Sequence, residues 1–172
     1  MPIYALGDLE PNIDPTAYIH PDAVIIGDVT IGSESSVWAC SVIRGDDGVI
    51  RIGDRSNIQD GAVLHTTPVY PTVVGNNCTI GHLAHLEGCT VEDDSLVGTA
   101  SVVLHNAVIQ RGALVGANAV VTGGTVVPEG AMALGIPAKI REGLANQEEI
   151  SLGVDSYVAR AKWFRDDLRR ID

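Results

Sequence analysis

An aliphatic residue recurs every six positions along most of this chain, and no other feature constrains the fold as strongly. The longest unbroken series runs through Val91, Val97, Val103, Ile109, Val115, Val121 and Val127. The same spacing occurs in Ile13, Ile19, Ile25, Ile31 and Val37, in Ile52, Ile58 and Leu64, and again between Ile80 and Leu86. A small residue often stands four positions after the aliphatic one.

A period of six matches neither the 3.6-residue period of an amphipathic helix nor the two-residue alternation of a long strand. It is typical of a hexapeptide β-helix, in which each six residues form a short strand and a turn, and three such units close a triangular coil of about 18 residues. We therefore predict an all-β fold, a parallel β-helix of about seven coils over residues 13–140. Residues 1–12 are predicted to form an N-terminal lead-in.

Residues 141–172 are predicted to form a linker and a C-terminal α-helix. Tyr157, Ala161, Phe164 and Leu168 recur with the spacing of a single helical stripe. Asp155 is a candidate N-cap for this helix. We expect Trp163 and Phe164 to pack the helix against one face of the β-helix.

Composition excludes several classes of function. The net charge of −11 argues against nucleic acid as a partner, because phosphate binding requires a basic stripe. No apolar run approaches the ~18 residues of a membrane span, and the start of the chain does not resemble a secretory signal. The three cysteines have no regular spacing. We expect a cytoplasmic protein with reduced thiols and without a membrane partner.

The repeat is interrupted after His65. Leu64 and Leu86 occupy the same phase in adjacent coils, yet they are separated by 22 positions rather than by about 18. The excess predicts a small loop that includes Pro68 and Pro71. Loops on a rigid scaffold often carry binding and catalytic residues.

The polar residues around this loop predict a metal site. Because Leu64 and Leu86 point inward, His65 and Glu87 should point outward on adjacent coils, and His85 should share the outward face of Glu87. His82 should lie near a corner, and we expect these four side chains to converge on a small area. The remaining histidines, His20 and His105, are expected to be incidental.

A catalytic zinc ion takes three protein ligands and a water, and it binds imidazole nitrogen and carboxylate oxygen. His65, His82 and either His85 or Glu87 would supply such a set. Nearby, Arg44 and Asp46 are expected to form an ion pair that ties coils or subunits together.

Three segments taken in order resemble the gamma-class carbonic anhydrase family. They are Ile43-Arg44-Gly45-Asp46, Asn57-Ile58-Gln59-Asp60-Gly61-Ala62-Val63-Leu64-His65 and Ile80-Gly81-His82. The resemblance covers about residues 10–140. It implies a left-handed β-helix that assembles as a homotrimer with metal sites between subunits, and an activity that reversibly hydrates carbon dioxide to bicarbonate.

The resemblance also implies roles for individual residues. His65 and the residue at position 87 would bind the metal from one subunit, and His82 would bind it from the neighbouring subunit. Arg44 and Asp46 match an intersubunit ion pair, Gln59 matches a residue that orients the metal-bound hydroxide, and Asp60 matches its structural neighbour. Zinc is the expected metal, with iron or cobalt as alternatives, because imidazole binds all three.

The chain departs from the family at two places, which leaves three functions open. The family usually has histidine where this chain has Glu87, so the third ligand is either Glu87 or His85. The loop after His65 is short and lacks the acidic residues of the best-known active members. The alternatives to hydration are therefore a metal-binding trimeric scaffold with weak or no catalysis, and an acyltransferase that uses coenzyme A and a histidine base.

Overall fold

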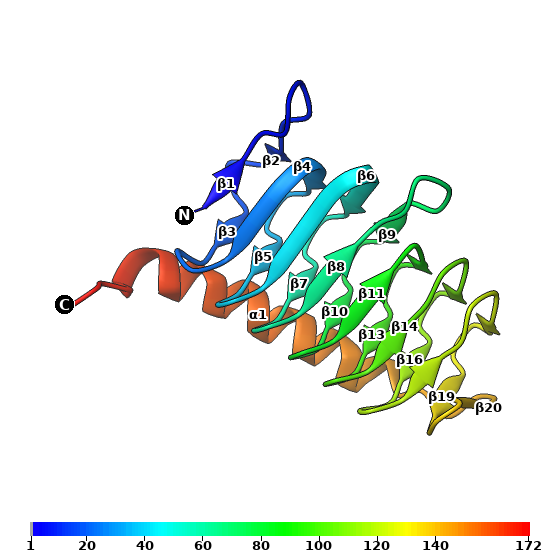
Figure 1. The fold of residues 1–172 in the computed structure, drawn as a ribbon. Coiled ribbons are helices and arrows are strands. Elements are labelled where there is room, and N and C mark those ends of the chain that lie inside the picture. Colours follow the sequence, from blue (N-terminus) through cyan, green and yellow to red (C-terminus); the bar gives the residue numbers. More distant parts are fainter. Residues whose placement is uncertain (1) are drawn as a thin grey trace.

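Short parallel strands stack into three flat faces that wind together as a β-helix, with one α-helix alongside (Figure 1). The computed structural model describes residues 2–172. The first face consists of β1 (Ile3–Tyr4), the first parts of β4 (Val24–Ile31) and β6 (Val42–Ile52), β8 (Val63–His65), β11 (His85–Glu87), β14 (Val102–Val103) and β17 (Val120–Val121). We call it the site face.

The second face contains the later parts of β4 and β6, and the third carries the helix. The other strands of the second face are β2 (Asn12–Ile13), β9 (Thr72–Val74), β12 (Thr90–Val91), β15 (Val108–Ile109) and β18 (Val126–Val127). The third face comprises β3 (Tyr18–Ile19), β5 (Ser36–Val37), β7 (Asn57–Ile58), β10 (Thr79–Ile80), β13 (Leu96–Val97), β16 (Leu114–Val115), β19 (Met132–Leu134) and β20 (Lys139–Arg141). Its seven parallel strands, β3 to β19, agree with the prediction of about seven coils.

The six-residue period is confirmed as the inward-facing set of side chains. On the site face, Ile25, Ile43, Leu64, Leu86, Val103 and Val121 lie in register, and each is completely buried. Stacking identical positions from coil to coil removes a continuous apolar column from water, which is what stabilises a repeat that could not bury its apolar face alone.

The predicted interruption after His65 is also confirmed. Leu64 pairs with Leu86 and His65 pairs with Glu87, so the excess residues form a loop between β8 and β9. This loop is fastened to the scaffold, because the Thr66 hydroxyl donates to the Tyr70 carbonyl at 2.9 Å and the Thr72 hydroxyl donates to the His65 carbonyl.

Both ends of the coil stack carry extra strands. At the start, β1 pairs with β4 through Ile3 and Ile25, so residues before the repeat already extend the site face. At the end, β20 runs antiparallel to β19 and covers its outer edge. Covering the edge satisfies backbone groups that would otherwise be free to pair with another chain.

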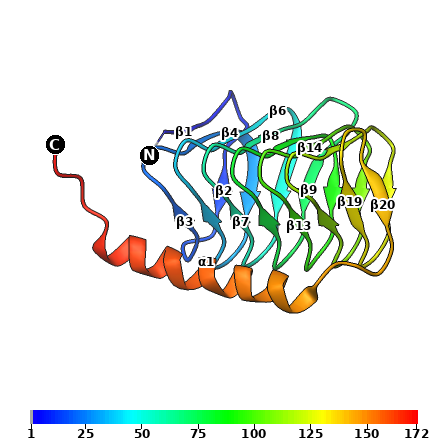
Figure 2. The ribbon, with the colours of Figure 1, turned by 90° about the horizontal axis from the view of Figure 1, so that it is seen from below.

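The helix α1 (Gln147–Asp167) runs back along the β-helix and contacts β3, β5, β7 and β10 of the third face (Figure 2). Its N-cap is Asn146, whose side chain accepts from the backbone N–H groups of Glu148 and Glu149. The prediction of Asp155 as N-cap is therefore wrong, and Asp155 lies inside the helix. No helix of the described residues is long and apolar enough to cross a membrane.

Aromatic rings anchor the second half of α1. Tyr157, Ala161 and Phe164 pack with Tyr18 and Trp38 of the β-helix, and the Phe164 ring lies 5.0 Å from that of Trp38. Trp163 instead remains 61% exposed, which contradicts the prediction that it packs against the β-helix. It stands two residues beyond the buried Ala161, about 200° further around the helix.

Candidate metal centre

His65 and Glu87 lie side by side on the site face, as the repeat predicts. Their Cα atoms are paired between β8 and β11, and His65 Nδ1 is 3.5 Å from Glu87 Oε1. Two ligand atoms that bind one tetrahedral zinc ion at 2.0–2.1 Å lie about 3.4 Å from each other. The separation of these two atoms therefore suits a shared ion.

The second nitrogen of His65 lacks a hydrogen bond. Nε2 is buried and has no hydrogen-bond partner among residues 2–172, although Asp46 Oδ1 lies 3.4 Å away without suitable hydrogen-bond geometry. Buried polar atoms in folded proteins nearly always have a partner. The His65 ring thus has a carboxylate on each side, Glu87 at Nδ1 and Asp46 at the unpartnered Nε2, and an imidazole flanked in this way fits a metal ion.

Two further imidazoles hold the Glu87 carboxylate. His85 Nε2 lies 3.3 Å from Oε2, and His105 Nε2 lies 3.2 Å from Oε1. Hydrogen bonds from His85 and His105 hold the pKa of Glu87 below its ordinary value, so the group is anionic at neutral pH. An anionic carboxylate can bind a metal without first losing a proton.

His105 is the functional residue that sequence reasoning missed. It was expected to be incidental, yet it contacts Glu87 and lies beside Tyr70 of the loop, with ring centroids 6.5 Å apart. The available signal was its position 18 residues after Glu87, which is the length of one regular coil.

Arg44 and Asp46 form the predicted ion pair, and the structure places it within one chain. Burial raises the pKa of Asp46, but hydrogen bonds from the backbone and from Arg44 outweigh it, and the pKa is lower than usual. Asp46, Asp47 and His65 present ligand atoms within 4.8 Å of one another. Asp46 is thus a neighbour of the candidate site as well as an ion-pair partner.

His82 does not join this cluster within a single chain, so the expectation that all four side chains converge is wrong for His82. The reason is that His82 lies in the turn before β11, whereas Glu87 lies at the other end of that strand. Its Nδ1 is 2.9 Å from Asp60 Oδ2, and its Nε2 is 3.4 Å from the Tyr157 hydroxyl.

Asp60 and Gln59, which the family resemblance also implies as site residues, lie at the same corner as His82. Asp60 contacts it directly, and Gln59 is buried at the same corner, where its amide nitrogen donates to Asn57 Oδ1 at 2.9 Å. The candidate residues therefore form two groups, one around His65 and Glu87 on the site face and one around His82 at a corner.

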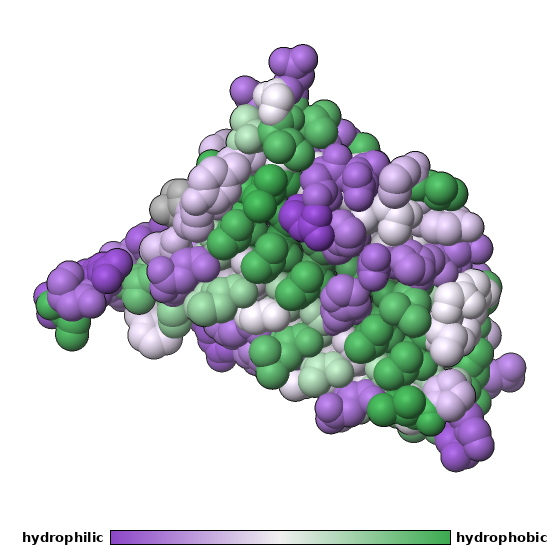
Figure 3. All heavy atoms as spheres, viewed as in Figure 1, coloured by the Kyte–Doolittle hydropathy of each residue, from purple (hydrophilic) through white to green (hydrophobic). Residues whose placement is uncertain are grey.

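An apolar row crosses the site face beside His65 and Glu87, and Figure 3 shows a hydrophobic surface extending over these strands. Five valines and one histidine occupy consecutive outward positions in register: Val24, Val42, Val63, His85, Val102 and Val120. Val63 is 37% exposed. An outward row that is aliphatic except at His85 has the character of a surface that another protein molecule covers.

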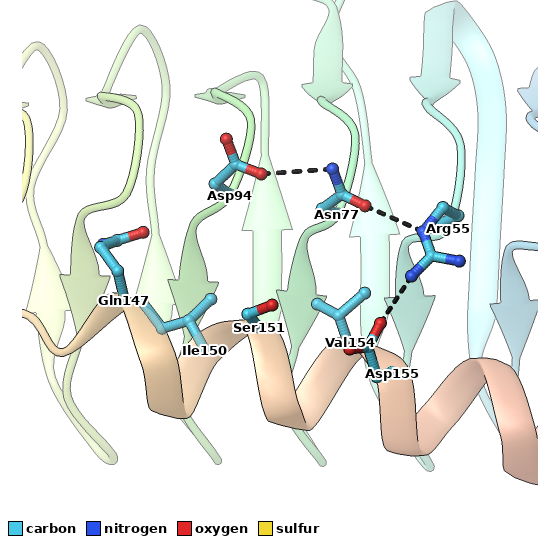
Figure 4. Close-up of a pocket in the computed structure, with 8 residues that line it drawn as sticks. All are labelled: Arg55, Asn77, Asp94, Gln147, Ile150, Ser151, Val154 and Asp155. Atoms are coloured by element: carbon cyan, nitrogen blue, oxygen red, sulfur yellow. Dashed lines mark hydrogen bonds and ion pairs between the residues drawn. The ribbon is translucent and has the colours of Figure 1, made fainter.

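A separate cleft of about 280 Å³ between α1 and another corner contains none of the predicted site residues (Figure 4). Its polar groups are mutually satisfied. Arg55 donates to Asp155 at 2.6 Å and to Asn77 at 3.1 Å, and Asn77 donates to Asp94 at 3.2 Å. This chain of hydrogen bonds fastens the helix to the β-helix.

Comparison with known proteins identifies relatives over nearly the whole chain. Residues 10–45 match the family model described as bacterial transferase hexapeptide (six repeats). A carbonic anhydrase of Geobacillus kaustophilus is 41% identical over 165 residues, which cover 95% of this chain and 91% of that protein.

A plant relative and a solved structure extend this similarity. Gamma carbonic anhydrase 2, mitochondrial, of Arabidopsis thaliana is 38% identical over 163 residues, and the aligned part covers 90% of this chain but only 59% of the plant protein. The crystal structure of a hexapeptide transferase family protein from Anaplasma phagocytophilum has a TM-score of 0.91 at 34% identity. That match covers 95% of this chain and 98% of the other.

Proposed function

Because this chain belongs to the gamma carbonic anhydrase family, we propose that it is a metal-dependent enzyme that interconverts carbon dioxide and bicarbonate at a site between subunits. The observation that carries the proposal is the pairing of His65 with Glu87, in which Nδ1 of His65 lies 3.5 Å from Glu87 Oε1. The buried Nε2 on the other side of the same ring has no hydrogen-bond partner among residues 2–172. Zinc is the metal that this nitrogen and oxygen ligand set favours, and iron or cobalt are alternatives.

His65 and Glu87 of one subunit and His82 of a neighbouring subunit would hold the ion. Glu87 is favoured over His85 as the third ligand because it is the register partner of His65, whereas His85 is paired with Val63. His85 and His105 would then act by orienting the two oxygens of Glu87. Such partners of a ligand are known to strengthen metal binding.

The His82 group is prepared for this role. Asp60 lies at hydrogen-bond distance from Nδ1 of His82, which favours the tautomer with the lone pair on Nε2. Within one chain that nitrogen lies 3.4 Å from the Tyr157 hydroxyl, a contact that metal binding would replace. Gln59 is held at the same corner by Asn57, and the family resemblance gives it the task of orienting the attacking water. When bound, the metal would lower the pKa of a water molecule so that it can attack carbon dioxide near neutral pH.

The proposal requires a homotrimer, or at least an assembly of adjacent subunits, because His82 cannot meet His65 within one chain. The apolar row that contains Val63 supports this assembly, since it adjoins His65 and Glu87 directly. A neighbouring subunit that covered the row would bring its own side chains to the candidate metal position.

Metal content after purification without added metal tests the proposal. We expect about one ion per chain in the natural protein, and loss of metal in Glu87→Ala and His82→Ala, because three protein ligands are needed. His20→Ala is the matched control and should retain metal. Full metal content in His82→Ala with loss in His85→Ala or His105→Ala would instead place the site within one chain.

A second candidate function is metal binding in a scaffold with little catalysis. Glu87 favours it, since a carboxylate ligand reduces the positive charge that acts on the bound water and should raise the pKa of that water above ~7. Stopped-flow hydration of carbon dioxide by the metal-loaded protein separates the two functions. An enzyme should show a rate that rises with pH, whereas a scaffold should not exceed the metal-free control.

Absence of metal even after reconstitution would refute both functions. The remaining alternative would then be an acyltransferase that uses coenzyme A, which the transferase family of the Anaplasma protein supports. Binding of coenzyme A to the metal-free protein would be the next measurement.

A further inference from the structure

A cleft of about 540 Å³ lies between the second half of α1 and the corner that carries His82. Its volume falls within the range of small-molecule sites, roughly 300–1,000 Å³. Carbon dioxide has only three atoms and does not require such a space. The cleft shares His82 and Asp60 with the proposed metal centre, but the proposed hydration does not explain its size or its other lining residues.

Aromatic rings form one side of the cleft. Trp38, Tyr157, Trp163 and Phe164 all line it, and the Phe164 ring is edge-on both to Trp38 at 5.0 Å and to Trp163 at 5.4 Å. Phe164 and Trp38 are engaged in packing, whereas Trp163 leaves 61% of its surface exposed. An exposed indole at the edge of an aromatic cleft offers a stacking surface for a flat ring.

The charged groups that line the cleft are one cation and one carboxylate, Arg160 and Asp60. Although the chain carries a net charge of −11, Arg160 lines the cleft, stacks over the Tyr157 ring at 4.9 Å and forms no ion pair with any residue from 2 to 172. Asp60 is the single carboxylate among the lining residues, and it already faces His82 at 2.9 Å. An unpaired guanidinium is well suited to a carboxylate.

From the exposed indole, the unpaired Arg160 and the volume of the cleft, we infer that it binds a flat organic carboxylate. The aromatic body of the ligand would lie against Trp163, and its carboxylate would receive hydrogen bonds from Arg160. His20, on the neighbouring coil, lines the same space, and because its Nδ1 accepts from the backbone N–H of Asp22 at 3.1 Å, its Nε2–H is a further donor. This inference does not rest on the proposed hydration activity, because Trp163 and Arg160, which carry it, are not among the residues proposed to hold the metal.

Intrinsic fluorescence gives a direct measurement, because both tryptophans of the chain line the cleft. The purified full-length protein would be titrated with benzoate, with excitation selective for tryptophan. Benzamide serves as the neutral ring of the same shape, and acetate serves as the anion without a ring. We expect a saturable change with benzoate, and affinity weaker by about tenfold for benzamide, the order expected for loss of a charge-assisted hydrogen bond.

Variants locate the binding. Arg160→Gln should weaken benzoate binding by about tenfold, whereas the matched control Arg141→Gln, which changes an exposed arginine outside the cleft, should not. Trp163→Leu should weaken binding several-fold, with Trp38 as the remaining reporter, and circular dichroism would verify the fold of each variant. Equal affinity for benzoate and benzamide, or unchanged affinity in Arg160→Gln, would overturn the inference.

The outcome is independent of the metal centre when the titration is repeated with metal-free protein. Saturable benzoate binding without any hydration activity would support the cleft and count against the proposed enzyme. Hydration activity without saturable benzoate binding would support the proposed enzyme and overturn the inference about the cleft.

Discussion

The cysteines show how position in the repeat controls the chemistry of a single residue. Cys78 and Cys89 are buried, and burial raises the pKa of each thiol to about 12. Cys40 lies in an exposed turn. Because the thiolate is the reactive form, two of the three thiols are kept protonated across the neutral range.

We therefore predict that one thiol per chain, Cys40, reacts with an aromatic disulfide reagent at pH 8 in the native protein. All three should react after unfolding in denaturant. Cys40→Ser should abolish the native reaction and leave the reaction of the unfolded chain at the other two positions. Rapid labelling of Cys78 or Cys89 in the folded protein would contradict the burial argument.

Glycine at position 45, between the ion-paired Arg44 and Asp46, is required by space. A Cβ atom at Gly45 would lie 2.6 Å from the backbone carbonyl oxygen of Asp28 on β4, which is closer than real contacts permit. We predict that Gly45→Ala lowers the free energy of unfolding by about 1–3 kcal/mol, the usual cost of forcing extra atoms into a packed site. Denaturant titration followed by circular dichroism would measure it.

Gly153 provides the matched control. It lies within α1, and a Cβ atom there would meet nothing within 4 Å. Gly153→Ala should raise stability by up to about 1 kcal/mol, because alanine is the better helix former. A loss of stability at Gly153 comparable to that at Gly45 would show that the space argument is wrong.

At the scale of elements, α1 is held mainly by its aromatic contacts with the third face. Phe164 packs against Trp38 and Tyr18, with ring centroids 5.0 and 6.3 Å away, whereas the ring of Trp163 makes a ring contact with that of Phe164 alone among residues 2–172. We predict that Phe164→Ala lowers the free energy of unfolding by about 2 kcal/mol and that Trp163→Ala changes it by no more than about 0.5 kcal/mol. Thermal unfolding of both variants would check the contrast.

The contrast between these two neighbours also marks the limit of sequence reasoning. The six-residue period fixes which aliphatic side chains point inward, and from that it correctly predicts the coil stack, the loop after His65 and the adjacency of His65 and Glu87. It contains no information about the rotation of α1 against the β-helix. Phe164 belongs to the helical stripe and packs as predicted, whereas Trp163 lies outside that stripe and is exposed.

For the candidate site, too, the repeat predicts which residues are neighbours on adjacent coils but not how separate surfaces pack together. Positions on neighbouring coils follow from the repeat, and the contact between His105 and Glu87 was available from their 18-residue separation although it was not used. The corner position of His82 also follows from the repeat, but its relation to His65 of another subunit does not, because the repeat carries no information about how subunits pack.

At the scale of the whole molecule, the apolar row on the site face should determine both assembly and metal binding. Val63 lies in this row, 37% exposed, with His65 two positions further along the same strand. In a trimer held through this face, a glutamate at position 63 would be buried without a partner, which is costly. We therefore predict that Val63→Glu prevents assembly of the proposed trimer and leaves monomers.

The same substitution links assembly to the metal centre, because in the proposed intersubunit site separation of the subunits would remove His82 from the His65 and Glu87 pair. Val63→Glu should therefore lose its metal together with its trimeric mass, measured by light scattering on a sizing column and by elemental analysis. Val126→Glu is the matched control, since Val126 is a 48% exposed valine on the second face and should tolerate the change in both assays. A Val63→Glu protein that remains trimeric would show that the subunits meet through another face, and a monomer that retains its metal would show that the ion needs only one chain.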